Sequence, residues 1–153
     1  MKALFSLTLA LMLSTAWTAV AAPLPSFKHL PNYGVYMKCE PFSWSAMSYL
    51  HSNGIPAVRI GYGWQRMGGA RGFHAAILFQ WEGKIYFMDN ERSAPRRVFA
   101  KTDMGAVNHI LSDFYTTCWM VNDDNERIAP RKLVDLFAPA PAWLRELQVG
   151  PKR

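Results

Sequence analysis

The chain has 153 residues, half of them hydrophobic and 14% aromatic, with a formal net charge of +6. This composition excludes a disordered chain, because the apolar side chains suffice for a core, and the length favours one domain. The positive charge would suit nucleic acid or an anionic surface. No run of Lys and Arg forms a binding stripe, however, and the nearest group, Arg92, Arg96 and Arg97, is expected to be a solvated loop.

The first 21 residues have the pattern of a secretory signal peptide. Lys2 supplies a positive start, Ala3–Leu13 is an apolar run too short to span a bilayer comfortably, and residues 19–21 form an Ala-Val-Ala cleavage motif. We therefore predict export to the periplasm or the cell exterior, with one mature domain over residues 22–153; an uncleaved N-terminal anchor is the alternative. Since an exported protein seldom meets nucleic acid, an anionic envelope surface or an acidic polymer is expected to fit the positive charge better.

The remaining chain predicts an α+β domain: a helix first, then antiparallel strands, then further helices. Helices are expected over about Pro41–Ser52, Asp103–Asp113, Arg131–Phe137 and Ala142–Leu147, and strands over Ala57–Tyr62, His74–Trp81, Lys84–Asp89, Arg97–Ala100 and Tyr115–Val121. The Pro-rich residues 22–38 should form an extended lead-in. Residues 63–72 contain four glycines and are expected to be a mobile loop beside His74.

The stretch from Gly72 to Glu91, GFHAAILFQWEGKIYFMDNE, is typical of a β-hairpin, with two apolar runs around a Glu-Gly turn. A two-residue turn at Glu82-Gly83 would pair Ala76 with Asp89. His74 lies on the same face of its strand as Ala76, so His74 and Asp89 would be diagonal neighbours within reach of a hydrogen bond. A three-residue loop would bring Asn90 to that position instead.

A histidine oriented by a carboxylate is a suitable base for a nucleophile, and the sequence offers Cys39 for that role. Cys39 is predicted to lie just before the N-terminus of a helix, where the helix dipole favours a thiolate. The chain has one other cysteine, Cys118. In an oxidising compartment a Cys39–Cys118 disulfide is the alternative to a reactive Cys39 and a free core thiol at Cys118.

The segments KCEPFSWSAMSYLHSNGIPAVRI and GFHAAILFQWEGKIYFMDNE together resemble the core of the bacterial transglutaminase-like cysteine proteinases, over about Cys39–Glu91. The resemblance implies a papain-like or transglutaminase-like core in which the helix of the catalytic cysteine packs on an antiparallel sheet. It also implies a triad of Cys39 as nucleophile, His74 as general base and Asp89 as orienting acid.

One departure from that family concerns calcium. Its calcium-dependent members have acidic residues on both sides of the cysteine, whereas here Lys38 precedes Cys39 and only Glu40 is acidic. The four histidines and two cysteines also lack a close-spaced ligand pair. We therefore expect no metal and no cofactor.

The lead-in before Cys39 is short, so the donors of an oxyanion hole are not evident from the sequence. The backbone N–H of Cys39 is one candidate, and the second could come from Asn32, Tyr36 or Gln65.

The function predicted from these residues is that of an exported, monomeric cysteine hydrolase, a protease or amidase. It would cleave an amide bond of a protein or peptide, including a peptidoglycan peptide, through an acyl-thioenzyme at Cys39. The alternative is a non-catalytic envelope-binding module of the same fold, in which Cys39 and Cys118 form a disulfide.

Overall fold

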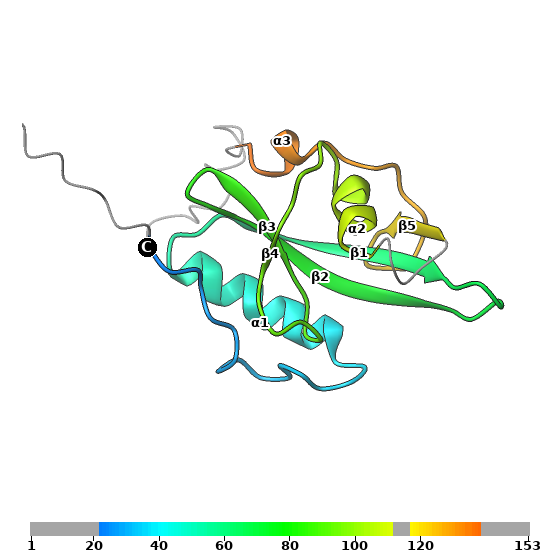
Figure 1. The fold of residues 1–153 in the computed structure, drawn as a ribbon, viewed down its shortest axis with the longest axis horizontal. Helices are drawn as coiled ribbons and strands as arrows, with labels where there is room; N and C mark the ends of the chain where they lie inside the picture. The colour runs from blue at the N-terminus through cyan, green and yellow to red at the C-terminus, as the bar shows by residue number, and fades with distance from the viewer. Residues whose placement is uncertain (1–21, 112–116, 139–153) are drawn as a thin grey trace, which may run out of the picture.

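The computed structural model describes residues 22–111 and 117–138. The predicted signal peptide and the helix predicted over Ala142–Leu147 lie outside these residues. The described part is α+β, as predicted, with a five-stranded antiparallel sheet in the order β4-β3-β2-β1-β5. Helix α1 lies along one face of the sheet and α2 lies on the other (Figure 1).

The elements follow the predicted order with shifted ends. Their bounds are α1 Cys39–Ser52, β1 Ala57–Gln65, β2 Arg71–Trp81, β3 Lys84–Met88, β4 Arg96–Arg97, α2 Asp103–Leu111, β5 Thr117–Val121 and α3 Leu133–Leu136. No helix among the described residues is both long and apolar enough to cross a membrane.

Helix α1 begins two residues earlier than predicted. Cys39 is its first residue and Lys38 its N-cap, so the thiol belongs to the first helical turn. Phe42, Ala46 and Leu50 are fully buried against the sheet, which is the apolar stripe expected from their spacing. The helix thus presents its N-terminus at a position fixed by packing along its length.

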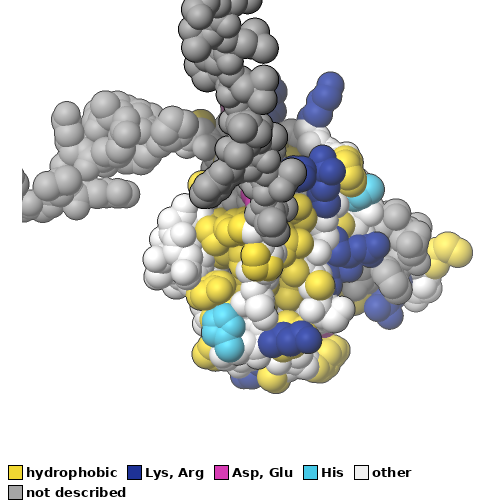
Figure 2. Space-filling view, turned by 60° about the vertical axis from the view of Figure 1, so that its left-hand side comes forward, with side chains coloured by type: hydrophobic (Ala, Val, Ile, Leu, Met, Phe, Trp, Pro, Cys, Tyr) yellow, Lys and Arg dark blue, Asp and Glu magenta, His cyan; other side chains and the backbone are white. Residues whose placement is uncertain are grey.

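The sheet has a separate core on each face because side chains alternate along its strands. Ile77 and Phe79 of β2 point toward α1 and pack there with Phe27 from the lead-in. Ala76 and Leu78 point the other way, into the core that α2 completes. On the face seen in Figure 2, apolar side chains gather in the middle, and Lys and Arg side chains lie singly or in small groups around them.

The register of the β2–β3 hairpin is confirmed. Ile77 pairs with Met88 and Leu78 with Phe87, as a two-residue turn requires. Glu82 and Gly83 both have positive φ, 48° and 71°, which is the type I′ turn that matches the twist of paired strands. Because β3 ends at Met88, Asp89 is the first residue after the strand.

The prediction of a mobile glycine loop over residues 63–72 is wrong. Strand β1 continues to Gln65 and β2 starts at Arg71, which leaves only a tight turn between them. Gly63 and Gly72 lie within the strands, where a Cβ would clash with the indole rings of Trp119 and Trp64 respectively. These two glycines therefore serve close packing of tryptophan on the backbone, and they do not mark a loop.

Helix α2 starts at Asp103, as predicted, and Thr102 caps it, since the Thr102 Oγ1 accepts a hydrogen bond from the Gly105 N–H at 3.0 Å. Asp103, in its first turn, is fully buried and bonded to Arg131. The third predicted helix is reduced to the single turn of α3, and the fourth predicted strand to the two residues of β4.

Candidate active site

The three residues predicted to form a triad come together where β3 ends. Cys39 opens α1, His74 lies on β2, and Asp89 directly follows β3. Strand β2 extends to Arg71, whereas β3 stops opposite Ile77. This difference in length lets the first turn of α1 approach His74.

His74 lies between the other two side chains. Its Nε2 is 3.5 Å from the Asp89 Oδ2, and both side chains are largely buried, with exposed fractions of 13% and 5%. The distance is that of an ion pair and is long for a hydrogen bond. The imidazole also interacts with the Cys39 thiol, which is half-buried.

Burial disfavours the charged forms of His74 and Cys39, but the groups in contact with them stabilise those charged forms more strongly. Burial would lower the pKa of His74, yet contacts with Asp89 and Cys39 raise that pKa to about 9. Burial likewise would raise the pKa of Cys39, but His74 and the backbone N–H groups of Ala75 and Glu40 leave it below its ordinary value. The two groups therefore favour a thiolate–imidazolium pair.

Asp89 is shared between two cations. Its Oδ1 accepts a hydrogen bond from the Glu91 N–H at 3.1 Å, and its Oδ2 lies 3.5 Å from both His74 Nε2 and Arg92 Nε. The guanidinium of Arg92 lies over the Phe87 ring, and its side chain is only 16% exposed. The prediction that Arg92 belongs to a solvated loop is thus wrong. Its spacing of three residues from Asp89 was the available signal.

Asn90, the alternative orienting residue, has a different contact. Its Nδ2 donates to the Val35 carbonyl at 2.6 Å, and its backbone carbonyl accepts from the Gly34 N–H at 2.7 Å. Asn90 is almost fully buried and attaches the lead-in segment to the end of β3. The geometry therefore favours Asp89 as the partner of His74, in keeping with the two-residue turn.

Of the side chains considered as oxyanion donors, Tyr36 alone lines a cavity at Cys39. Asn32 has a positive φ of 64° in the lead-in, and its carbonyl accepts from the Val35 N–H. Gln65 is exposed at the end of β1. Neither Asn32 nor Gln65 lines either cavity that contains the thiol.

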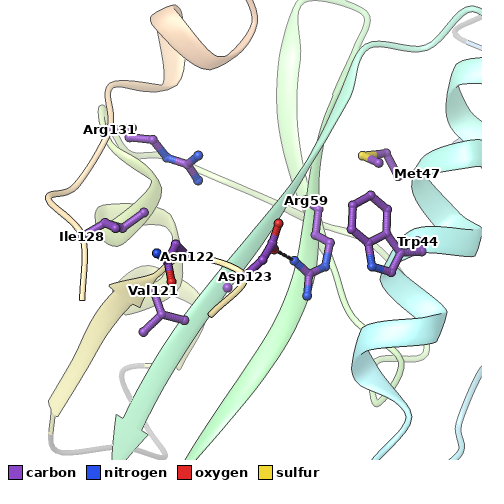
Figure 3. Close-up of a pocket in the computed structure, with 9 residues that line it drawn as sticks. Trp44, Met47, Arg59, Val121, Asn122, Asp123, Ile128 and Arg131 are labelled. Atoms are coloured by element: carbon purple, nitrogen blue, oxygen red, sulfur yellow. Dashed lines mark hydrogen bonds and ion pairs between the residues drawn. The ribbon is translucent and has the colours of Figure 1, made fainter. Parts of the chain in front are cut away.

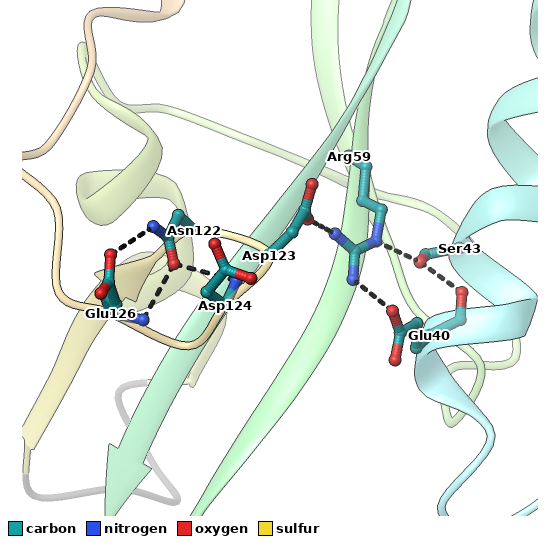
Figure 4. A network of polar contacts seen from close by, with 7 residues as sticks. All are labelled: Glu40, Ser43, Arg59, Asn122, Asp123, Asp124 and Glu126. Atoms are coloured by element: carbon teal, nitrogen blue, oxygen red, sulfur yellow. Dashed lines mark hydrogen bonds and ion pairs between the residues drawn. The ribbon is translucent and has the colours of Figure 1, made fainter.

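Arg59 of β1 fixes the first turn of α1 to the sheet. Its Nε donates to the Ser43 Oγ at 3.1 Å, and its guanidinium contacts the carboxylates of Glu40 and Asp123 (Figure 4). It also lies over the Trp44 ring, 5.0 Å from the centroid. This network could not be predicted from the sequence, because it joins residues that are distant in the chain; it includes Glu40, the neighbour of Cys39.

Two cavities meet at the thiol. The larger, of about 470 Å³, is lined by Cys39 and His74 together with Tyr36, Met37, Trp64, Arg66, Arg71, Gly72, Phe73 and Glu91. The smaller, of about 170 Å³, lies toward Arg59 and the loop after β5. A third cavity continues past Arg59 to Trp44 and Met47 of α1, and the residues around it are drawn in Figure 3. Cys39 therefore lies within a cleft that continues on both sides of it.

Cys118 lies in β5 opposite Trp64 and packs against the core on the α2 side. Burial raises the pKa of its thiol, which is the opposite of the shift at Cys39. Both cysteines are free, so the alternative of a Cys39–Cys118 disulfide is not found in the structure. Among the residues that the structure describes, no three His, Cys, Asp or Glu side chains form a group that could hold a metal ion.

Comparison with known proteins found no matching family model, no similar curated protein and no similar solved structure. The resemblance to transglutaminase-like cysteine proteinases stays a prediction from the sequence.

Proposed function

We propose that this protein is a cysteine hydrolase that cleaves an amide bond of a protein or peptide. The observation that carries the proposal is the position of His74 between the Cys39 thiol and the Asp89 carboxylate, in a cleft. A nucleophile, a base and an orienting group in that order are what thiol catalysis requires. The packing of α1 on an antiparallel sheet is compatible with a papain-like or transglutaminase-like core.

In the first chemical step, the thiolate of Cys39 attacks the carbonyl carbon of the scissile amide. The imidazolium of His74 gives its proton to the leaving amine as the C–N bond breaks, and an acyl-thioenzyme results. In the second step, His74 takes a proton from water as that water attacks the thioester. The carboxylic acid leaves, and the thiolate–imidazolium pair is restored.

The protein provides charge where the reaction needs it. Asp89 stabilises the imidazolium and orients its ring, while the N–H groups at the start of α1 face the negative charge that develops beside Cys39. The backbone N–H of Cys39 and the Tyr36 hydroxyl are the candidate donors to an oxyanion.

The proposal includes export, since a signal peptide was predicted over residues 1–21. N-terminal sequencing of the mature protein should then begin at Ala22 or Pro23. A full-length chain recovered from the cytoplasm would contradict export.

The reactivity of the Cys39 thiol, which the proposal requires, is tested by labelling with iodoacetamide. Cys39 should be alkylated at neutral pH much faster than Cys118, and a Cys39→Ala variant should lose the fast phase while Cys118→Ala retains it. The His74→Ala variant should be alkylated slowly, because it lacks the group that stabilises the thiolate. Equal rates at the two cysteines of the unmodified protein would contradict the proposal.

A further inference from the structure

Strand β2 has an open edge that begins at the thiol. Beyond Ile77, for six residues from Arg71 to Ala76, the strand pairs with β1 on one side, and no strand of the described residues pairs with it on the other. Trp81 and Lys84 flank the two-residue turn, so the N–H and C=O groups of odd-numbered β2 residues point toward β3. By the same alternation, those of Ala75, Phe73 and Arg71 point to the open edge.

The first of these residues already has a contact in that direction, because the Ala75 N–H faces the Cys39 thiol. The next, Phe73, has no hydrogen bond from its backbone on that side within residues 22–111 and 117–138. An unpaired strand edge of this kind is a template for another strand. Here the unpaired edge begins beside the Cys39 thiol, at Ala75, and continues away from it along Phe73.

The larger cavity lies along this edge. Gly72 and Phe73 of β2 line it together with Tyr36 and Met37 of the lead-in. Tyr36 and Met37 are 79% and 78% exposed, and Phe73 is 53% exposed, so three large apolar side chains border the cavity without being covered. Such a border is suited to the side chains of a bound segment.

The charged side chains that line the larger cavity are mainly positive. Arg66 and Arg71 line it against one carboxylate, that of Glu91. Arg71 is exposed, and its guanidinium makes no ion pair within the part of the chain that the structure describes. Because Arg71 and Phe73 lie on one face of β2, an acidic side chain on an added strand would pair with Arg71 across the ladder.

We propose that the substrate binds as an additional β-strand on the open edge of β2: an extended polypeptide, hydrogen-bonded to the backbone of Phe73, that carries an acidic side chain opposite Arg71. This inference rests on the proposed function and names its substrate class. An unfolded segment offers the alternating N–H and C=O groups that the edge requires, whereas a glycan chain or a folded surface does not. Main-chain pairing provides the affinity, and the side chains beside Arg71 provide the selectivity.

The test uses acetyl-Ala-Glu-Ala-Ala vinyl sulfone, a peptide that reacts covalently with thiols. The Cys39 sulfur adds to the vinyl carbon that is bonded to the last Ala residue, and a proton passes to the vinyl carbon beside the sulfone, so no group leaves. The rate constant for labelling of Cys39 is measured with each peptide amide N-methylated in turn. An added strand predicts a loss of ten-fold or more at alternate amides and a smaller loss at those between, since only alternate N–H groups face β2. Equal losses at all positions would overturn the proposal.

Two variants of Phe73 give a matched test on the protein. Phe73→Pro removes the N–H that points to the open edge and leaves the pairing with β1 intact, whereas Phe73→Val removes the ring and keeps the donor. The proposal predicts that labelling by the peptide slows at least five-fold more in the proline variant than in the valine variant. Equal slowing in both variants would contradict the backbone contact.

The charge is tested by a swap. Replacing Glu by Lys in the peptide should slow labelling of the unmodified protein by about five-fold or more, and Arg71→Glu should reverse that preference. A preference that survives the reversal would contradict the role of Arg71.

Iodoacetamide, which needs no strand, separates the two proposals. If Cys39 reacts with iodoacetamide in a His74-dependent way but the peptides show neither alternation nor charge preference, the strand proposal fails and the hydrolase proposal stands. If the iodoacetamide reaction is slow and independent of His74, the hydrolase proposal itself fails.

Discussion

Two buried aspartates, Asp89 and Asp103, each lie beside an arginine, but their surroundings differ. Asp103 accepts hydrogen bonds of 2.7 and 2.9 Å from the N–H groups of Met104 and Arg131, and one of 2.9 Å from the Arg131 Nε. Within the part of the chain that the structure describes, Asp89 accepts one hydrogen bond, from the Glu91 N–H, and has two longer contacts at 3.5 Å. Both carboxylates are almost completely buried.

The difference indicates which carboxylate is structural. A buried charge is tolerated when several short hydrogen bonds replace water, and Asp103 meets that condition at the junction of α2 with the segment before α3. The Asp89 oxygen that faces His74 has longer contacts in place of short hydrogen bonds. Its negative charge therefore remains available to stabilise an imidazolium. The cysteines differ in the same sense, since Cys39 faces partners that stabilise its thiolate and Cys118 faces a core.

The largest expected effect is that of removing the base. His74→Ala should lower the turnover of an amide substrate by about 10³-fold or more, and Cys39→Ala should do the same, with little further loss in the double variant because the two act as one unit. The melting temperature should change little. His109→Ala is the control, because His109 is exposed on α2 and should leave turnover unchanged. Additive losses would show that the two side chains act separately.

Removing Asp103 should have the opposite pattern of effects, with a clear loss of stability and little loss of activity. Asp103→Ala leaves Arg131 without its buried partner and should lower the free energy of unfolding by about 3 kcal/mol. Turnover measured well below the melting temperature should stay close to that of the unmodified protein. Chemical denaturation followed by circular dichroism measures the first quantity. A variant that is stable but inactive would contradict the structural role of Asp103.

Asp89→Ala should mainly affect activity, with a loss of about 10²-fold that is smaller than the loss for His74→Ala, because Asp89 orients and stabilises the imidazolium without touching the substrate. Asn90→Ala should have a smaller effect on turnover, since its amide holds the Val35 carbonyl. If Asn90→Ala abolished turnover and Asp89→Ala spared it, Asn90 would be the orienting residue.

The pH dependence provides a second measure of Asp89. With the pKa of His74 near 9, the imidazolium persists at neutral pH and is lost as the pH rises through about 9, so turnover should fall there. Asp89→Asn removes a charge that raises this pKa and should move the alkaline limit to lower pH. The alkylation rate of Cys39 as a function of pH gives the same information without a substrate. An unchanged alkaline limit in the variant would mean that Asp89 does not act on His74.

The hairpin and its consequence were predictable because short-range rules decide them. The Glu82-Gly83 turn fixed the pairing of Ile77 with Met88, and that register brought His74 near Asp89. Cys39 was also placed near the helix start by its neighbours. Local patterns therefore contained most of the proposed triad.

What could not be predicted depends on contacts between distant segments. From the sequence, Gly63 and Gly72 are interpreted as loop residues. The tryptophans that pack on them lie on other strands, so these contacts are evident only in the folded sheet. Arg59 joins α1 to a loop 64 residues later in the chain, at Asp123. The open edge of β2 exists because β3 is shorter, which the predicted strand ends did not resolve. Each of these features requires the tertiary structure.

The smallest expected effect concerns Arg92, which competes with His74 for the Asp89 Oδ2. Both nitrogens are 3.5 Å from that oxygen, and the Arg92 side chain is largely buried over Phe87. In Arg92→Gln the carboxylate would face one cation instead of two, so it should stabilise the imidazolium more and raise the pKa of His74 further. The alkaline limit of turnover should therefore move to higher pH, opposite to its movement in Asp89→Asn. At neutral pH, where His74 is already charged, turnover should change by no more than about three-fold.

The matched control is Arg96→Gln, which removes the same charge from an exposed position on β4. If the alkaline limit moved equally in both variants, the shift would reflect the net charge of the protein. If it moved to lower pH in Arg92→Gln alone, Arg92 would be holding Asp89 in place for His74, and the guanidinium would support the pair. Movement to higher pH in Arg92→Gln alone would establish that Asp89 divides its charge between a cation that titrates and one that does not. At Asp103, by contrast, the cation found among the described residues is Arg131, which is permanently charged.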